Sequence, residues 1–68
     1  MYPNLRAEMA RHNVTMSQVA AALHVQLATL SRKMSGINDF TLGEARAIKK
    51  FLRVDMTIDE LFKKADIL

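Results

Sequence analysis

Few side chains in this sequence stand where covalent or metal chemistry would need them. Cysteine is absent, and we expect the two histidines, His12 and His24, to have no cysteine, histidine or acidic partner at the spacing of metal ligands. No Ser/His/Asp arrangement, paired carboxylates or glycine-rich phosphate loop is found either. The sequence therefore predicts a protein that is not an enzyme and that has no metal site and no cofactor. His24 is interpreted as a turn residue.

The chemistry that remains is that of hydrogen bonds and charge. The net charge is +3, and it is unevenly spread. No acidic residue lies between Met9 and Asn38, a stretch that contains Arg11, Arg32 and Lys33. Basic residues also outnumber acidic ones up to residue 53, whereas the end of the chain is mildly acidic. This layout favours a polyanionic partner, and the alternative is a basic surface that serves solubility alone.

Composition limits the fold. With 68 residues the chain makes one domain at most, and 50% of its residues are apolar, which is too many for a disordered chain. The apolar residues are mainly Ala, Leu, Ile, Val and Met, a composition that favours helices. No apolar run approaches the roughly 18 residues that span a membrane, and residues 1–4 lack the start of a signal peptide. We therefore expect one cytoplasmic domain over residues 1–68, with no membrane contact.

One capping pattern occurs three times along the chain. In each copy a threonine is followed three residues later by Gln or Glu, with an apolar residue on either side. The hydroxyl can accept a hydrogen bond from the third amide of the helix, and the longer side chain can reach back to the cap amide. Three such boxes predict three helix starts. The pairs are Thr15 with Gln18, Thr41 with Glu44, and Thr57 with Glu60.

A fourth helix start is hidden within residues 20–36, AAALHVQLATLSRKMSG. Val25 and Leu30 are spaced as the apolar pair that flanks a cap, with Gln26 as a weaker cap residue between them. A helix that begins at Gln26 requires the preceding one to stop just before His24, which then falls where a left-handed residue is wanted. We therefore favour two short helices over one continuous helix.

These signals predict an all-α, compact bundle of about five short helices. None would be stable alone, so each must bury one face. The predicted helices span about residues 3–12, with Asn13 as a left-handed cap, then 16–23, 27–34, 42–52 and 58–64. The last helix is expected to carry two acid-to-base pairs, Asp59 with Lys63 and Glu60 with Lys64. The predicted core is Leu5, Met9, Val19, Ala20, Leu23, Leu30, Met34, Phe40, Leu42, Ala45, Ile48, Leu52, Ile58, Leu61 and Phe62.

Residues 15–36, TMSQVAAALHVQLATLSRKMSG, resemble the helix-turn-helix of phage repressor and Cro-type regulators, the lambda-repressor-like family. The resemblance extends over five short helices and most of the chain. His24 stands where the family has glycine at the corner. A small residue is needed where the two helices cross, and Ala20 supplies it. The other matching positions are Val25, Leu30 and Ser35-Gly36.

The resemblance implies a small sequence-specific regulator that binds double-stranded DNA with residues 26–34 in the major groove. Leu27 and Ala28 can only pack against a thymine methyl, so readout would rest on Arg32 for guanine and Gln26 for adenine. Met16 stands where the family often has a phosphate-binding glutamine. By position, the base-reading residues are Gln26, Leu27, Ala28, Ser31 and Arg32. The phosphate contacts are Thr15, Met16, Ser17, Thr29, Lys33, Ser35 and Asn38.

The expected partner is a short two-fold operator, bound by a weak homodimer in which Ile67 and Leu68 contribute to the contact. The resemblance places such a regulator at the nucleoid of a bacterial or phage-infected cell. Leu27, Ala28 and Met16 leave an alternative open. The chain could be a protein-interaction module, an antitoxin-like protein or an accessory phage protein that keeps the fold with weakened DNA readout.

Overall fold

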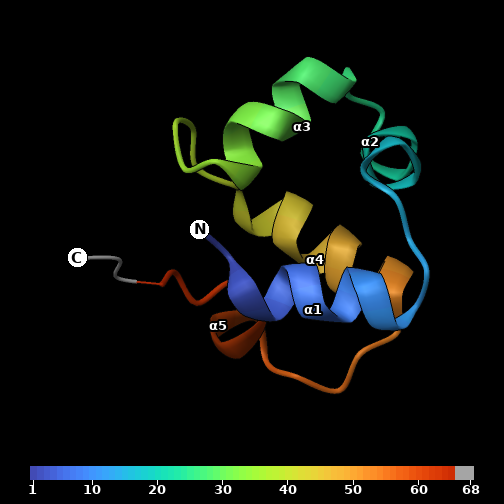
Figure 1. The fold of residues 1–68 in the computed structure, drawn as a ribbon, viewed down its shortest axis with the longest axis vertical. Helices are drawn as coiled ribbons and strands as arrows, with labels where there is room; N and C mark the ends of the chain where they lie inside the picture. Colours follow the sequence, from blue (N-terminus) through green and yellow to red (C-terminus); the bar gives the residue numbers. More distant parts are fainter. Residues whose placement is uncertain (66–68) are drawn as a thin grey trace.

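Five helices make up the part of the chain that the computed structural model describes, residues 1–65 (Figure 1). No strand is present in these residues, so the prediction of an all-helical fold is confirmed. The bundle has a radius of gyration of 11.0 Å. Within the same residues, no helix combines the length and the apolar character needed to cross a bilayer. The helices are α1 (Pro3–Arg11), α2 (Met16–Leu23), α3 (Leu27–Met34), α4 (Leu42–Leu52) and α5 (Ile58–Leu61).

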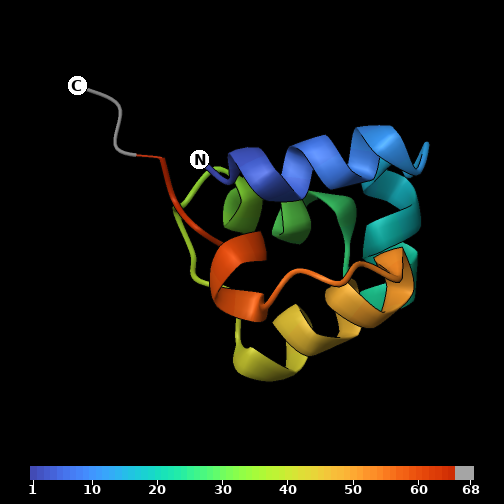
Figure 2. The same ribbon diagram turned by 90° about the horizontal axis from the view of Figure 1, so that it is seen from below.

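The helices are arranged around one core. Helix α2 packs against α3 and α4, and α5 packs against α4 and α1. In Figure 1, α3 runs across the upper edge of the molecule and α2 is seen nearly end-on, so these two helices cross steeply. Helices α1 and α5 occupy the opposite edge, and Figure 2 shows α1 and α4 on either side of the bundle. Helix α3 therefore lies at the outside of the fold.

All three predicted capping boxes are confirmed. At the start of α2, Thr15 Oγ1 accepts from the Gln18 amide at 3.2 Å, and Gln18 Oε1 accepts from the Thr15 amide at 2.8 Å. The same reciprocal bonds begin α4 and α5. Each box satisfies two amides that a helix start would otherwise leave without partners. The other two boxes are Thr41 with Glu44 and Thr57 with Glu60.

The expected break between α2 and α3 is present at His24, which adopts the left-handed conformation with φ 57° and ψ 40°. The His24 amide donates to Ala21 O at 3.2 Å, and the Val25 amide donates to Ala20 O at 3.0 Å. This pair of bonds is the Schellman arrangement that closes a helix end. Gln26 occupies the cap position of α3 but makes no side-chain cap bond, as expected of a weak cap.

Replacing His24 with glycine should raise the free energy of unfolding by about 1 kcal/mol, because a left-handed backbone is strained for a residue with a Cβ and free for glycine. The wider freedom of glycine in the unfolded chain offsets part of this gain. Thermal and urea unfolding would measure the change. His24→Val is the control and should be destabilising, because a β-branched residue tolerates this conformation poorly. A glycine variant less stable than the parent would mean that the imidazole itself stabilises the corner.

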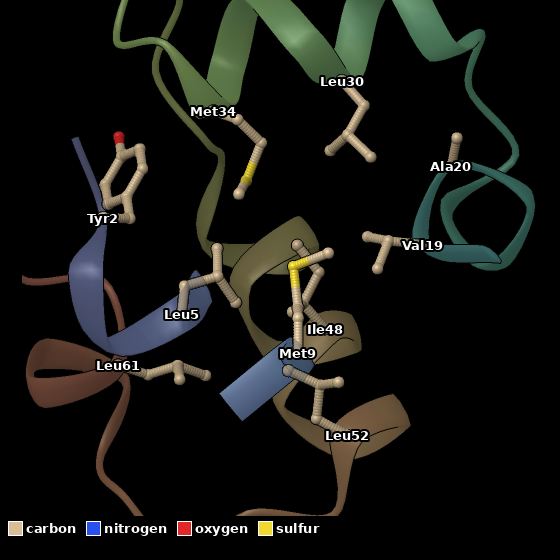
Figure 3. Close-up of a cluster of buried hydrophobic side chains, with 10 residues drawn as sticks. All are labelled: Tyr2, Leu5, Met9, Val19, Ala20, Leu30, Met34, Ile48, Leu52 and Leu61. Carbon is tan, nitrogen blue, oxygen red and sulfur yellow. The ribbon is translucent and has the colours of Figure 1, made fainter. Parts of the chain in front are cut away.

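The core is formed by side chains from all five helices (Figure 3). Most of the predicted core positions are buried, whereas Leu23, Phe40, Ile58 and Phe62 are only half-buried. The prediction is wrong for Leu42, which is 58% exposed. Its spacing places it on the buried side of α4, but it is the first residue of that helix and borders an open hollow instead of a packed neighbour.

Tyr2 is a core residue that the sequence analysis missed, since it precedes the first expected helix. Its side chain is 3% exposed. The ring packs edge-on against Phe40 at 5.4 Å and Phe62 at 5.9 Å between centroids. Such aromatic pairs add to the stability gained from burial alone. The three rings therefore join the residue before α1 to the segment that precedes α4 and to the residue that follows α5.

The last helix is shorter than expected, because α5 ends at Leu61. The predicted pairs of Asp59 with Lys63 and Glu60 with Lys64 are therefore wrong. The Glu60 carboxylate accepts from the Thr57 amide at 3.1 Å, and its backbone carbonyl accepts from Asn4 Nδ2 at 2.7 Å. Lys64 Nζ lies 3.2 Å from Asp39 Oδ1 instead. Contacts with residues distant in the sequence therefore take the place of the two predicted pairs.

Candidate nucleic-acid interface

Helix α3 has one buried and one exposed side. Leu30 and Met34 point into the core and are 0% and 1% exposed. Five other residues at the start and middle of the helix are open to solvent. Their spacing of three and four residues places them together. This surface, called the α3 face below, consists of Gln26, Leu27, Ala28, Ser31 and Arg32, which are all exposed and are the five predicted base-reading residues.

The α3 face offers a mixed set of contacts. The Arg32 side chain makes no ion pair within residues 1–65, so its guanidinium is available as a two-pronged donor. Gln26 makes no cap bond with its side chain, which leaves the amide group available too. Leu27 is 49% exposed and Ala28 adds a methyl group beside it. The face can therefore combine directional hydrogen bonds with apolar contact.

The predicted phosphate contacts at the start of α2 differ in what they can offer. Thr15 Oγ1 accepts from the Gln18 amide, which leaves its O–H able to donate to a phosphate. Met16 is half-buried and packs against the core, whereas Ser17 is exposed. The Met16 and Ser17 amides belong to the first turn, where a helix has donors without intrahelical partners. An anion at this end would therefore be held by backbone amides and by the Thr15 and Ser17 hydroxyls.

The remaining predicted phosphate contacts lie at the far end of α3. Thr29 is half-buried, and Asn38 is exposed in the loop that follows the helix. Ser35 Oγ donates to Ser31 O at 2.9 Å, which leaves its oxygen free to accept only. These side chains flank the α3 face without belonging to it, and their contact with phosphate stays a prediction.

Lys33 is the predicted contact that the structure places elsewhere. Its Nζ lies 2.8 Å from Glu44 Oε1 and 3.3 Å from Asp39 O, and its side chain is only 13% exposed. The ammonium group is therefore used to fasten α3 to the start of α4. The sequence analysis missed this pair because the capping pattern already gave Glu44 a role. Binding of Lys33 to a phosphate would require this ion pair to break.

The Glu44 carboxylate is held on both sides. Burial raises its pKa, but hydrogen bonds from Lys33 and from the Thr41 amide outweigh burial and lower the pKa overall. The carboxylate is therefore ionised at neutral pH, and it serves the cap of α4 and the anchor to α3 at the same time.

The expectation that neither histidine has an acidic partner is wrong for His12. Its Nε2 lies 3.7 Å from Oε1 of Glu8, which precedes it by one helical turn. Glu8 is buried and its Oε2 also lies 2.9 Å from Arg11 Nη1, so the carboxylate is engaged by neighbours on α1. Within residues 1–65, no three His, Cys, Asp or Glu side chains converge as metal ligands would.

No family model, curated protein or solved structure matches this chain. Its function is therefore inferred from its own geometry. The decisive feature is that the five residues of the α3 face, which belong to an acid-free stretch of sequence, lie together on the exposed side of α3. Ile67 and Leu68, the predicted dimer contacts, lie outside the described residues.

Proposed function

We propose that the protein binds double-stranded DNA as a small transcriptional regulator of the repressor or Cro type, with α2, the His24 corner and α3 acting as a helix-turn-helix. The observation that supports this most is the α3 face. It is exposed, free of acidic residues and long enough to present two turns of helix to a groove. An α-helix fits the major groove of B-DNA, where each base pair presents a distinct pattern of donors and acceptors.

Arg32 and Gln26 would supply most of the base discrimination. Arg32 can donate two hydrogen bonds to O6 and N7 of guanine, and the Gln26 amide can accept from N6 and donate to N7 of adenine, each pair giving about 1–3 kcal/mol of discrimination. Leu27 and Ala28 would pack against thymine methyl groups. Because few residues discriminate, a single domain would read DNA with modest specificity. Two copies on a two-fold site, with α3 helices about 34 Å apart, would read a longer sequence.

Selection of bound duplexes from a random library, followed by gel shifts over a range of salt concentrations, tests this function. Binding should fall steeply with salt, because phosphate contacts release counterions. Arg32→Ala should reduce affinity for the selected site by about ten- to hundredfold and relax the preference at one base position. Arg46→Ala is a matched control, since Arg46 is also exposed but lies on α4. If no duplex binds at low salt, or the two variants behave alike, the proposed DNA contact is wrong.

A second function is favoured by one observation, the 49% exposure of Leu27 at the start of α3. In a protein-interaction module, antitoxin-like protein or accessory phage protein, Leu27 and Ala28 would contact another protein instead of thymine. The two functions can be separated because a protein partner would bind without DNA. Leu27→Glu should then abolish that binding in a nuclease-treated sample, and an unchanged complex would exclude the α3 face as its contact.

A further inference from the structure

Four basic side chains follow one side of α4, on a surface that the α3 face does not include. Helical spacing places Arg46, Lys49 and Lys50 on the same side of the helix, and Arg53, the left-handed residue that follows its last turn, lines the same groove. None of them makes an ion pair within the described residues, and all except the half-buried Lys49 are exposed. This basic stripe, about 10 Å long at the rise of an α-helix, consists of Arg46, Lys49, Lys50 and Arg53.

The basic stripe forms one wall of a groove of about 640 Å³. Val54, Asp55 and Ile58, from the connection to α5 and its first residue, line the opposite side. Val54 and Ile58 are half-buried, so the groove presents apolar surface beside its charges. In Figure 1 the connection before α5 runs along the lower edge of the molecule, and α3 runs along the upper edge. The groove and the α3 face therefore lie on different sides of the fold.

We propose that this groove binds an acidic amphipathic helix of a partner protein. Four neighbouring cations without acidic partners repel one another, and carboxylates at helical spacing would relieve that repulsion. The apolar border formed by Val54 and Ile58 matches the apolar edge of such a helix, which a groove of this kind recognises through residues three and four apart. Two turns of a partner helix have the same length as the stripe.

The lining of the groove favours a peptide over a nucleic acid. The phosphate groups of a nucleic acid have no apolar surface to place against Val54 and Ile58, whereas leucine side chains of a helix do. It would also meet the negative charge of Asp55 within the same groove, whereas a helical peptide can present a polar or basic residue there. Because the groove lies away from the α3 face, occupation of one would leave the other accessible. The proposal does not rest on DNA binding.

Fluorescence anisotropy with one labelled synthetic peptide tests the groove. The probe is a helix-forming peptide of about 14 residues, with glutamates at every third or fourth position and leucines along the adjoining edge. We expect saturable binding that Arg46→Glu and Lys50→Glu each weaken about tenfold, because charge reversal turns attraction into repulsion. Arg32→Glu makes the same charge change on the α3 face and should alter binding less than about twofold. Circular dichroism would verify that each variant is folded.

Four results would overturn the proposal. They are the absence of saturable binding, an equal loss with Arg32→Glu, equal binding of a peptide with the same composition in scrambled order, and equal binding after the leucines become serines. Random-sequence duplex DNA or phosphatidylserine vesicles that bind the basic stripe more tightly than the peptide would also contradict it, by identifying a phosphate ligand. Loss of DNA binding alone would not, since the peptide assay contains no DNA.

Discussion

Leu30→Ala is expected to lower the free energy of unfolding by about 2–5 kcal/mol, the cost of removing three carbons from a packed site that cannot fully collapse. Leu30 is 0% exposed and points from α3 into the core (Figure 3). Domains of this size often have no more than about 3–5 kcal/mol of stability from their single core. The variant should therefore be largely unfolded at room temperature, with loss of helical circular dichroism.

Leu27→Ala is the matched control, because it removes the same atoms from the same helix. Leu27 is 49% exposed, so the cost should remain below about 1 kcal/mol. Urea unfolding followed at 222 nm would measure both variants, using the far-ultraviolet signal of the helices. Equal costs for the two leucines would mean that α3 does not bury the side assigned to it, and the α3 face would then be placed wrongly.

Local signals in the sequence predicted most of the element boundaries. A capping box is complete within four residues, so Thr41 and Glu44 could be paired without knowledge of the fold. The corner at His24 was found in the same way, from the apolar pair that flanks the next helix start. The residues of the α3 face were named through the resemblance to the repressor and Cro-type helix-turn-helix, and their exposure agrees with helical spacing. Short-range patterns were therefore sufficient for the helix starts and for the corner between α2 and α3.

Contacts between distant residues could not be read in this way. The pairing of Lys33 with Glu44 depends on how α3 meets α4, and the hydrogen bond from Asn4 to the Glu60 carbonyl joins residues that lie 56 positions apart. Tyr2 is buried because Phe40 and Phe62 converge on it from separate segments. None of these contacts has a local pattern. Sequence spacing also placed Leu42 on the buried side of α4. It could not show that no other element of residues 1–65 covers the first turn of this helix, where Leu42 is exposed.

The basic stripe shows a different limit. Its four residues were counted in the sequence as part of a basic segment, although their helical spacing was visible there. The groove beside them could not be predicted from the sequence, because Val54 and Ile58 come from the connection after α4 and from the next helix. A charged helix face becomes a candidate site only when the apolar surface next to it is known.

Ala20→Leu is the second substitution for which we expect a large effect. Ala20 is 4% exposed and lies on α2, which packs against both α3 and α4. A leucine here adds three carbons where two helices cross, and such overpacking costs about 1–3 kcal/mol in unfolding free energy. It should also push α2 and α3 apart. The unfolding midpoint in urea would measure the first effect, and gel shifts under conditions where the variant is folded would measure the second.

Ala21→Leu provides the comparison, since the neighbouring position is exposed and the same atoms are added to the same helix. Its unfolding free energy should stay within about 0.5 kcal/mol of the parent. If DNA binding depends on the relative placement of α2 and α3, the folded Ala20→Leu protein should bind DNA less tightly than Ala21→Leu, although neither residue belongs to the α3 face. Equal stability of the two variants would show that the crossing is loosely packed. Equal DNA binding by folded protein would show that α3 acts without the support of α2, which the proposed helix-turn-helix does not allow.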